Sequence, residues 1–104
     1  MVFPVANFIK LETGATKRML FDRWWWEDRK HTDPKSRMIK TSKVMVFHAI
    51  EEDGAKVDKI FSVLSYKLQE TLAPYIETGQ IFTRHVEITK QGEDYATEYA
   101  FRLV

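Results

Sequence analysis

The chain of 104 residues contains no cysteine, only four glycines and three prolines, and no long apolar run. Without cysteine it can form neither a disulfide scaffold nor a thiolate-ligated zinc site. A membrane-crossing helix needs about 20 consecutive apolar residues, so we expect no membrane partner. The first residues, Met1-Val-Phe-Pro, lead into no charged and then apolar segment of the signal-peptide kind. We therefore expect a cytoplasmic protein.

What the chain does contain is typical of one folded domain covering residues 1–104. Hydrophobic residues make up 44% and charged residues 30%, which favours a globular protein over a disordered one. The net charge is only +1, but it is unevenly distributed. Residues 16–43 hold nine basic and four acidic residues, a net +5, while the remainder holds seven and eleven, a net −4. A basic, aromatic-rich region of this kind indicates a polyanion-binding face, although lysines kept for solubility would produce a similar pattern.

All three tryptophans are consecutive, at Trp24, Trp25 and Trp26. Neighbouring side chains of a strand point to opposite faces, so Trp24 and Trp26 should share one face and Trp25 should take the other. A core on one side of a sheet cannot bury all three rings. At least one indole is therefore expected at the surface or at the rim of the core, where it could contact a ligand or another protein subunit.

Alternating apolar residues and turn signals predict six strands and one helix. The strands are expected at residues 5–12, 17–28, 38–51, 57–64, 81–89 and 95–104. Asp53-Gly54 is a hairpin signal because it supplies residues that accept positive φ. Ser65 is a plausible N-cap for a helix of roughly 8 to 12 residues, which should end by Gly79. His31–Ser36 and Lys90–Asp94 are expected to be loops.

The order of these elements favours one architecture. If the short strand at residues 5–12 is set aside as an extra N-terminal strand, the chain reads strand, strand, strand, helix, strand, strand. This is the order of the OB fold, a five-stranded Greek-key barrel whose helix lies between its third and fourth strands. The sequence thus predicts a mainly β, OB-like barrel. A generic α+β sheet and a ferredoxin-like domain are the alternatives.

Three segments carry a resemblance to a known family. Phe8-Ile-Lys-Leu-Glu-Thr-Gly-Ala-Thr-Lys-Arg-Met-Leu-Phe21 resembles the opening strand, glycine turn and next strand of compact viral and archaeal OB-fold proteins that bind single-stranded DNA. Phe61-Ser-Val-Leu-Ser-Tyr-Lys-Leu-Gln-Glu-Thr-Leu-Ala-Pro-Tyr75 is similar to their third strand and barrel helix. His85-Val-Glu-Ile-Thr-Lys-Gln-Gly-Glu-Asp-Tyr-Ala-Thr-Glu-Tyr99 resembles their final hairpin. The resemblance implies a role in DNA replication or repair.

Such proteins bind on the face of their second and third strands, with help from the first and last interstrand loops. Exposed aromatic rings stack on bases while lysine and arginine follow the phosphates. The predicted nucleic-acid-binding residues combine the aromatics and the cations of this region. They are Arg18, Phe21, Arg23, Trp24, Trp25, Trp26, Arg29, Lys35, Arg37, Lys40, Lys43, Phe47 and Lys90. Phe47 and Tyr95 could equally serve packing.

Catalytic and metal-binding patterns are weak. His31 with Asp33 and His85 with Glu87 each place two potential metal ligands on one side of an extended segment, but no third ligand has a suitable spacing. A serine that opens a helix, as Ser65 does, is ordinarily its cap. The glycines are isolated, which excludes a phosphate-cradling loop. We therefore expect no enzyme, no metal and no cofactor.

The sequence thus predicts a binding protein for single-stranded DNA with little sequence preference, and leaves RNA and a homodimer open as partners. The alternative is a protein-interaction or assembly module that uses the exposed tryptophan surface for self-association. A small-ligand carrier or enzyme with the aromatic run as a pocket wall is a third, weaker hypothesis.

Overall fold

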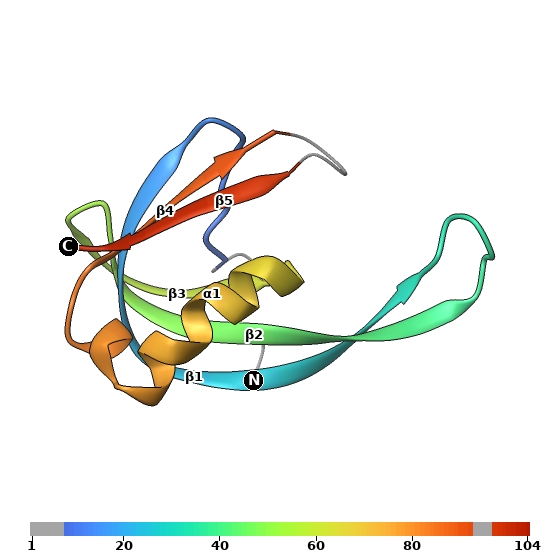
Figure 1. Ribbon diagram of the computed structural model, residues 1–104, viewed down its shortest axis with the longest axis horizontal. Coiled ribbons are helices and arrows are strands. Elements are labelled where there is room, and N and C mark those ends of the chain that lie inside the picture. The colour runs from blue at the N-terminus through green and yellow to red at the C-terminus, as the bar shows by residue number, and fades with distance from the viewer. Residues whose placement is uncertain (1–7, 93–96) are drawn as a thin grey trace.

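The computed structural model describes residues 8–92 and 97–104, which form one antiparallel sheet and one α-helix (Figure 1). The strands are β1 (Thr16–Thr32), β2 (Ile39–Glu52), β3 (Ala55–Val63), β4 (Val86–Gln91) and β5 (Glu98–Leu103), in the sheet order β3-β2-β1-β4-β5. The helix α1 (Tyr66–Glu77) and the short 3-10 helix η1 (Gln80–Phe82) connect β3 to β4. The prediction of a mainly β fold with one helix between the third and fourth of these strands is confirmed.

The predicted turn and helix-capping residues explain where these elements begin and end. Asp53 and Gly54 have φ values of 51° and 86°, so both adopt the left-handed conformation that a tight hairpin between β2 and β3 requires. The Ser65 hydroxyl accepts a hydrogen bond from the Leu68 amide at 3.3 Å and caps α1 as predicted. Gly79, at φ 77°, follows the helix and reverses the chain into η1.

The long strand β1 is shared between the two halves of the sheet. Its first residues pair with β4 and the rest of it pairs with β2. Two irregularities interrupt the β1–β2 ladder, because Asp22 on β1 and Ile50 on β2 each lack a partner in the register. An extra residue bends a strand and increases its local twist. These bulges accompany the strong curvature of the sheet in Figure 1.

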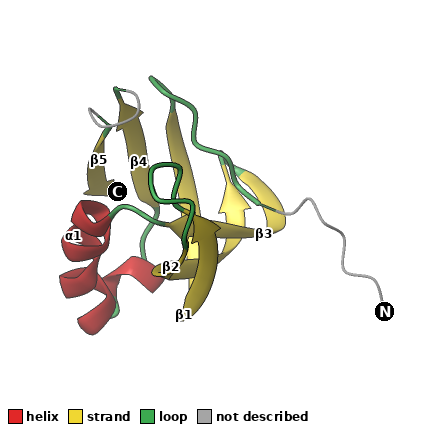
Figure 2. Ribbon diagram, turned by 90° about the vertical axis from the view of Figure 1, so that its right-hand side faces the viewer, coloured by secondary structure: helices red, strands yellow, loops and turns green. Residues whose placement is uncertain are grey.

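The concave side of the curved sheet holds the core, and α1 lies against it (Figure 2). Phe21 and Phe47 are fully buried there, and their rings stack with centroids 4.6 Å apart. Phe61 continues the stack from β3, 6.0 Å from Phe21. From the helix, Leu68 and Leu72 enter the same cluster. None of the helices in the described parts of the chain is long and apolar enough to cross a bilayer.

The sheet does not close into a barrel in the residues described. The strands β3 and β5 are the two edges of the sheet, and they are not paired with each other. The predicted strand at residues 5–12 is reduced, over residues 8–12, to an isolated bridge between Phe8 and Ile60. Residues 5–7 lie outside the described range. A second isolated bridge joins Thr13 to Lys90.

The last two strands are shorter than predicted. Residues 81–85 are not extended, because the chain leaves Gly79 in a helical turn that inserts Ile81 into the core. β4 therefore begins at Val86. The final strand begins at Glu98, and Tyr95 lies outside the described residues.

The β1–β2 hairpin extends well beyond the core, as Figure 1 shows on its right-hand side. We call residues 28–43 the arm. Every residue in this range is exposed or half-buried, whereas Val44, the next residue along β2, is fully buried. The arm is therefore a two-stranded ribbon stabilised by its own ladder and turn rather than by packing on the core.

Candidate nucleic-acid interface

The three tryptophans occupy three different environments. Trp24 and Trp26 lie on the same face, as predicted, with ring centroids 5.5 Å apart and an interplanar angle of 75°. Trp24 is half-buried and packs against the core cluster. Trp26 is two residues further along β1, about 7 Å nearer to the arm, and remains 47% exposed. Trp25 points to the opposite face, where the guanidinium of Arg23 lies 6.0 Å from its ring centroid.

Trp26 lines an open apolar recess between the root of the arm and the start of α1. We call this the Trp26 recess; it is lined by Trp26, Ser42, Lys43, Leu64, Tyr66 and Gln69. Its volume is about 580 Å³. Leu64 and Tyr66, at 65% and 70% exposure, are as accessible as many charged surface residues. Large apolar side chains exposed together in this way mark an interaction site on a folded protein.

The Gln69 side chain fixes the recess between the helix and the sheet. It is the buried polar residue of the core, and its Nε2 donates to the carbonyl oxygens of Lys43 at 3.1 Å and Val63 at 2.9 Å. One amide therefore joins α1 to both β2 and β3 beside Trp26. The two hydrogen bonds hold the helix in place against the strands, because a buried carbonyl oxygen left without a donor would cost free energy.

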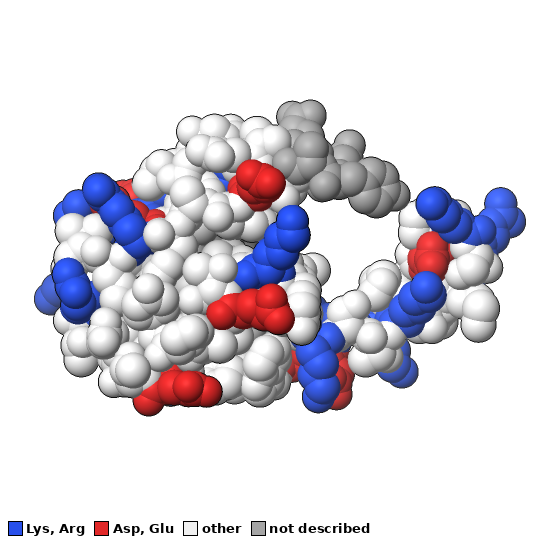
Figure 3. Space-filling model, viewed as in Figure 1, with Lys and Arg blue, Asp and Glu red and all other residues white. Residues whose placement is uncertain are grey.

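The arm carries most of the positive charge that the sequence places in this region. Residues 28–43 hold six basic and two acidic residues, a net +4 with histidine neutral. In Figure 3, lysine and arginine side chains follow the arm from its root to its tip, with acidic groups interspersed. Lys43 pairs with Asp28 at 3.0 Å, and Lys40 pairs with Asp33 at 2.8 Å.

The turn at the end of the arm is held by internal hydrogen bonds. The Asp33 carbonyl accepts from the Arg37 amide at 2.8 Å, and the Asp33 carboxylate accepts from the Lys35 amide at 2.9 Å. Hydrogen bonds from the Lys40 ammonium and from the Lys35 amide lower the pKa of Asp33, so this carboxylate stays ionised. Arg37 adopts a left-handed φ of 57°. The tip thus presents Lys35 and Arg37 to solvent on an ordered turn.

The opposite face of the hairpin holds a second, smaller aromatic group. Here Arg29 donates to Glu27 at 3.0 Å and to the Ser62 hydroxyl at 2.9 Å, and its guanidinium lies 5.9 Å from the Phe8 ring centroid. Arg29 is therefore engaged within the fold. Arg23 thus lies over the Trp25 ring, and Arg29 lies over the Phe8 ring. Both guanidinium groups contact aromatic rings of the fold instead of pointing into solvent along the arm.

Four predicted residues lie away from the arm and the Trp26 recess. Phe21 and Phe47 lie fully buried in the core, where their rings stack on adjacent strands. Arg18 lies at the other end of β1, where it donates to the Glu87 carboxylate. Lys90 is on β4, and its backbone bonds to Ala15 and Gly14 beside the first turn, remote along the sheet from the arm.

Of the other nine predicted residues, five lie along the arm or in the recess, while Trp24 packs on the core and Trp25, Arg23 and Arg29 lie on the opposite face. Trp26 and Lys43 line the recess, and Lys35, Arg37 and Lys40 lie on the arm that leads from it. Leu64 and Tyr66 were not predicted. A signal for Tyr66 exists in the sequence, because it lies two residues ahead of Leu68 and therefore off the apolar stripe that α1 turns toward the core.

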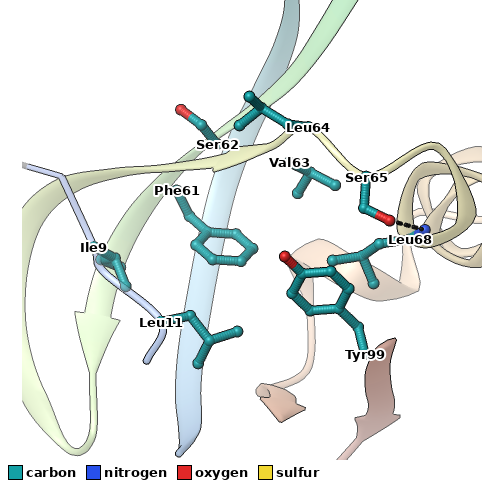
Figure 4. A pocket seen from close by; sticks show the side chains of 9 residues that line it. All are labelled: Ile9, Leu11, Phe61, Ser62, Val63, Leu64, Ser65, Leu68 and Tyr99. Atoms are coloured by element: carbon teal, nitrogen blue, oxygen red, sulfur yellow. Dashed lines mark hydrogen bonds between the residues drawn. The ribbon is translucent and has the colours of Figure 1, made fainter. Parts of the chain in front are cut away.

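A second cavity offers little chemistry. It lies between β3, α1 and β5 and has a volume of about 140 Å³ (Figure 4). It is lined by Ile9, Leu11, Phe61, Ser62, Val63, Leu64, Ser65, Leu68 and Tyr99. Its polar side chains are hydroxyls, of which that of Ser65 already caps the helix. No tryptophan lines this cavity, so it does not match the pocket that the small-ligand hypothesis requires.

The members of the two histidine pairs of the sequence have different partners in the structure. His31 contacts the Ser42 hydroxyl, whereas Asp33 binds Lys40. His85 contacts Glu51 at 2.9 Å, whereas Glu87 binds Arg18 and Arg102. Within residues 8–92 and 97–104, no group of three or more potential ligands could hold a metal ion. Comparisons of the chain with protein-family models, with curated proteins and with solved structures find no match.

Proposed function

We propose that the protein binds single-stranded DNA, with little sequence preference, along the arm and in the Trp26 recess. The observation that supports this most strongly is a half-exposed indole at the root of a ribbon with a net charge of +4. An exposed aromatic ring beside a cationic track is the combination by which sequence-tolerant proteins hold a single strand.

Trp26 would supply the stacking surface. Every base has a π-face, so stacking on an indole is worth about 1–3 kcal/mol per base and discriminates little between sequences. Tyr66, from the start of α1, lines the same recess and offers a second ring. A hydrogen bond to the Glu70 carboxylate raises the pKa of Tyr66 above its ordinary value.

The arm would supply the phosphate contacts. Lys30, Lys35 and Arg37 are exposed along it, and none of the three is in an ion pair among the described residues. Lys40 and Lys43 are paired only with surface carboxylates, and such pairs exchange readily for phosphate because exposed ion pairs are worth little. Counterion release should make the affinity fall steeply with salt.

The OB-like interpretation of the fold supports the same function. The central position of β1 between β2 and β4 and the helix after β3 agree with OB order, with β3 and β5 left open as edges. In that fold the loop between the first two strands contributes to the ligand site. Here this loop is the tip of the arm. The preference for DNA over RNA rests on the resemblance of the sequence segments alone.

Self-association is the second candidate. It is favoured by two apolar side chains at the tip of the arm, Met38 and Ile39, which are 65% and 72% exposed. Together with the Trp26 recess they could bury a protein partner.

One experiment separates the two functions. Fluorescence anisotropy of labelled oligo-dT is measured at about 50 mM and about 200 mM salt, alongside the mass of the protein in solution by light scattering. Tight, salt-sensitive binding supports the proposal. Absence of binding with a concentration-dependent rise in mass would instead support the assembly function.

A further inference from the structure

We propose that the tip of the arm is an apolar wedge that inserts Met38 and Ile39 at the junction between single-stranded and double-stranded DNA. This rests on the proposed function, because it assigns the arm a second contact on the same nucleic acid. It goes further in naming the substrate, a single strand that continues into a duplex.

The exposure of these two residues calls for a partner. Met38 and Ile39 are adjacent, both are more exposed than Trp26, and they lie where the turn of the arm enters β2. They contribute nothing to the buried cluster of the described residues. An apolar pair that stabilises no core is more readily explained by a ligand than by folding.

The surroundings of the pair favour a nucleic acid over a protein groove. Lys35 and Arg37 precede the pair and Lys40 follows it on β2, and the arm as a whole carries a net +4. An apolar protein surface would have to bury these cations or leave them at its rim without partners. Phosphates on both sides of a base step would neutralise them instead.

The shape of the arm suits insertion. Isoleucine and methionine are among the side chains that proteins insert between base steps, and here they are presented at the end of a narrow two-stranded ribbon. The turn is preorganised, because Asp33 and Met38 are joined by a backbone hydrogen bond of 2.9 Å and the Ser36 hydroxyl accepts from the Met38 amide at 3.3 Å. Because the turn is already ordered, binding to DNA does not have to supply the free energy of ordering it.

The spacing predicts how the two contacts share one ligand. Thr32, which pairs with Ile39, lies six residue steps beyond Trp26 along β1, so the recess and the tip are about 20 Å apart. This corresponds to about six stacked nucleotides at about 3.4 Å each. One DNA molecule could therefore place a base of its single-stranded tail in the recess and its duplex junction at the tip, if the tail has about six nucleotides.

The test uses a duplex with a dT tail of about six nucleotides and a 2-aminopurine in its terminal base pair. The wild-type protein is compared with M38S/I39T, in which both apolar groups become polar and Ile39 keeps a β-branched residue in the strand. The matched control is V104T, which changes an exposed apolar residue at the C-terminal end of the described chain.

We expect the wild-type and V104T proteins to bind the tailed duplex about tenfold more tightly than the isolated tail, as expected from burial of one apolar side chain. At equal occupancy of the tail, 2-aminopurine should brighten as its neighbour unstacks. M38S/I39T should lose the preference and the brightening, and should bind oligo-dT within about twofold of wild type.

The wedge is overturned if M38S/I39T keeps the junction preference, or if the wild-type protein shows none. It is also overturned if the substitutions change only the mass of the protein in solution, since the tip would then contact another subunit. If wild type fails to bind oligo-dT at all, the proposed function falls together with this inference. Binding to oligo-dT without junction preference removes the wedge alone.

Discussion

Trp24 and Trp26 share one face of β1, with ring centroids 5.5 Å apart, yet Trp24 packs on the core and Trp26 is half-exposed. The difference comes from their positions along the strand. Trp24 is opposite Phe47 and Trp26 opposite Met45 in the β1–β2 register, and beyond them the sheet continues into the arm. The edge of the core thus falls between two adjacent rings.

This relationship predicts that the two tryptophans differ in their contribution to stability. Trp24→Ala should lower the free energy of unfolding by about 2–4 kcal/mol, because it leaves a cavity against the core. Trp26→Ala should cost about 1 kcal/mol, because it removes mainly one edge-to-face contact. Urea unfolding followed by circular dichroism measures both. Equal losses for the two variants would contradict the assignment of their environments.

Gln69 should be important for stability although it is polar. Gln69→Leu keeps the size of the side chain but leaves the carbonyl oxygens of Lys43 and Val63 without their donor. We expect the free energy of unfolding to fall by about 2 kcal/mol. Gln80→Leu, at an exposed position in η1, is the matched control. A loss no larger than that of the control would mean that the amide does not join the helix to the sheet.

Stability should depend on pH through His48. Hydrogen bonds from its ring to Asp58 and Asp22, both at 2.6 Å, raise its pKa above 6.5 against burial and the nearby charge of Arg23. A group whose pKa is raised by folding stabilises the protein fully below its unfolded pKa and loses this effect as pH rises through its folded pKa. The free energy of unfolding should therefore fall on raising the pH from about 6 toward 8.

The His48→Gln variant tests this origin. Its unfolding free energy should vary less over the same pH range, whatever its absolute value. His31→Gln, at an exposed position on the arm, should keep the wild-type pH profile. A profile unchanged by His48→Gln would show that other groups cause the dependence.

The arm should determine the salt dependence of binding. Each phosphate contact to a single strand contributes about 0.7 to the slope of log affinity against log salt, so K30Q/K35Q/R37Q should reduce the slope by about 2. The control K10Q/K56Q/R84Q removes three exposed cations outside the arm. Titrations of oligo-dT over a range of salt concentrations measure the slopes. A control slope reduced as much as that of the arm variant would place the strand elsewhere.

The sequence predicts the local features of this fold well. The Asp53-Gly54 turn, the Ser65 cap and the shared face of Trp24 and Trp26 each depend on two to four neighbouring residues, and each is found as expected. The order of strands and helix follows from the same local signals.

Features set by long-range contacts were not predictable. The bulge at Asp22 changes which side chains face the core, and nothing in the periodicity marks it, so the sequence does not show that Phe21 is buried on the same side as Trp24. The pairing of Arg18 with Glu87 joins residues far apart in the sequence. Likewise, the recess needs Leu64 and Tyr66 to meet Trp26, which only the docking of α1 brings about.

The most direct test of the account is the quenching of tryptophan emission by oligo-dT in the wild-type protein and in Trp26→Phe. Since a base stacked on Trp26 would quench that indole and leave Trp24 in the core, we expect saturable quenching in the wild type. Most of it should be lost in Trp26→Phe, while Trp25→Phe should retain it. Quenching that persists undiminished in Trp26→Phe, or that is absent from the wild-type protein, would contradict the assignment of Trp26 as the base-stacking residue.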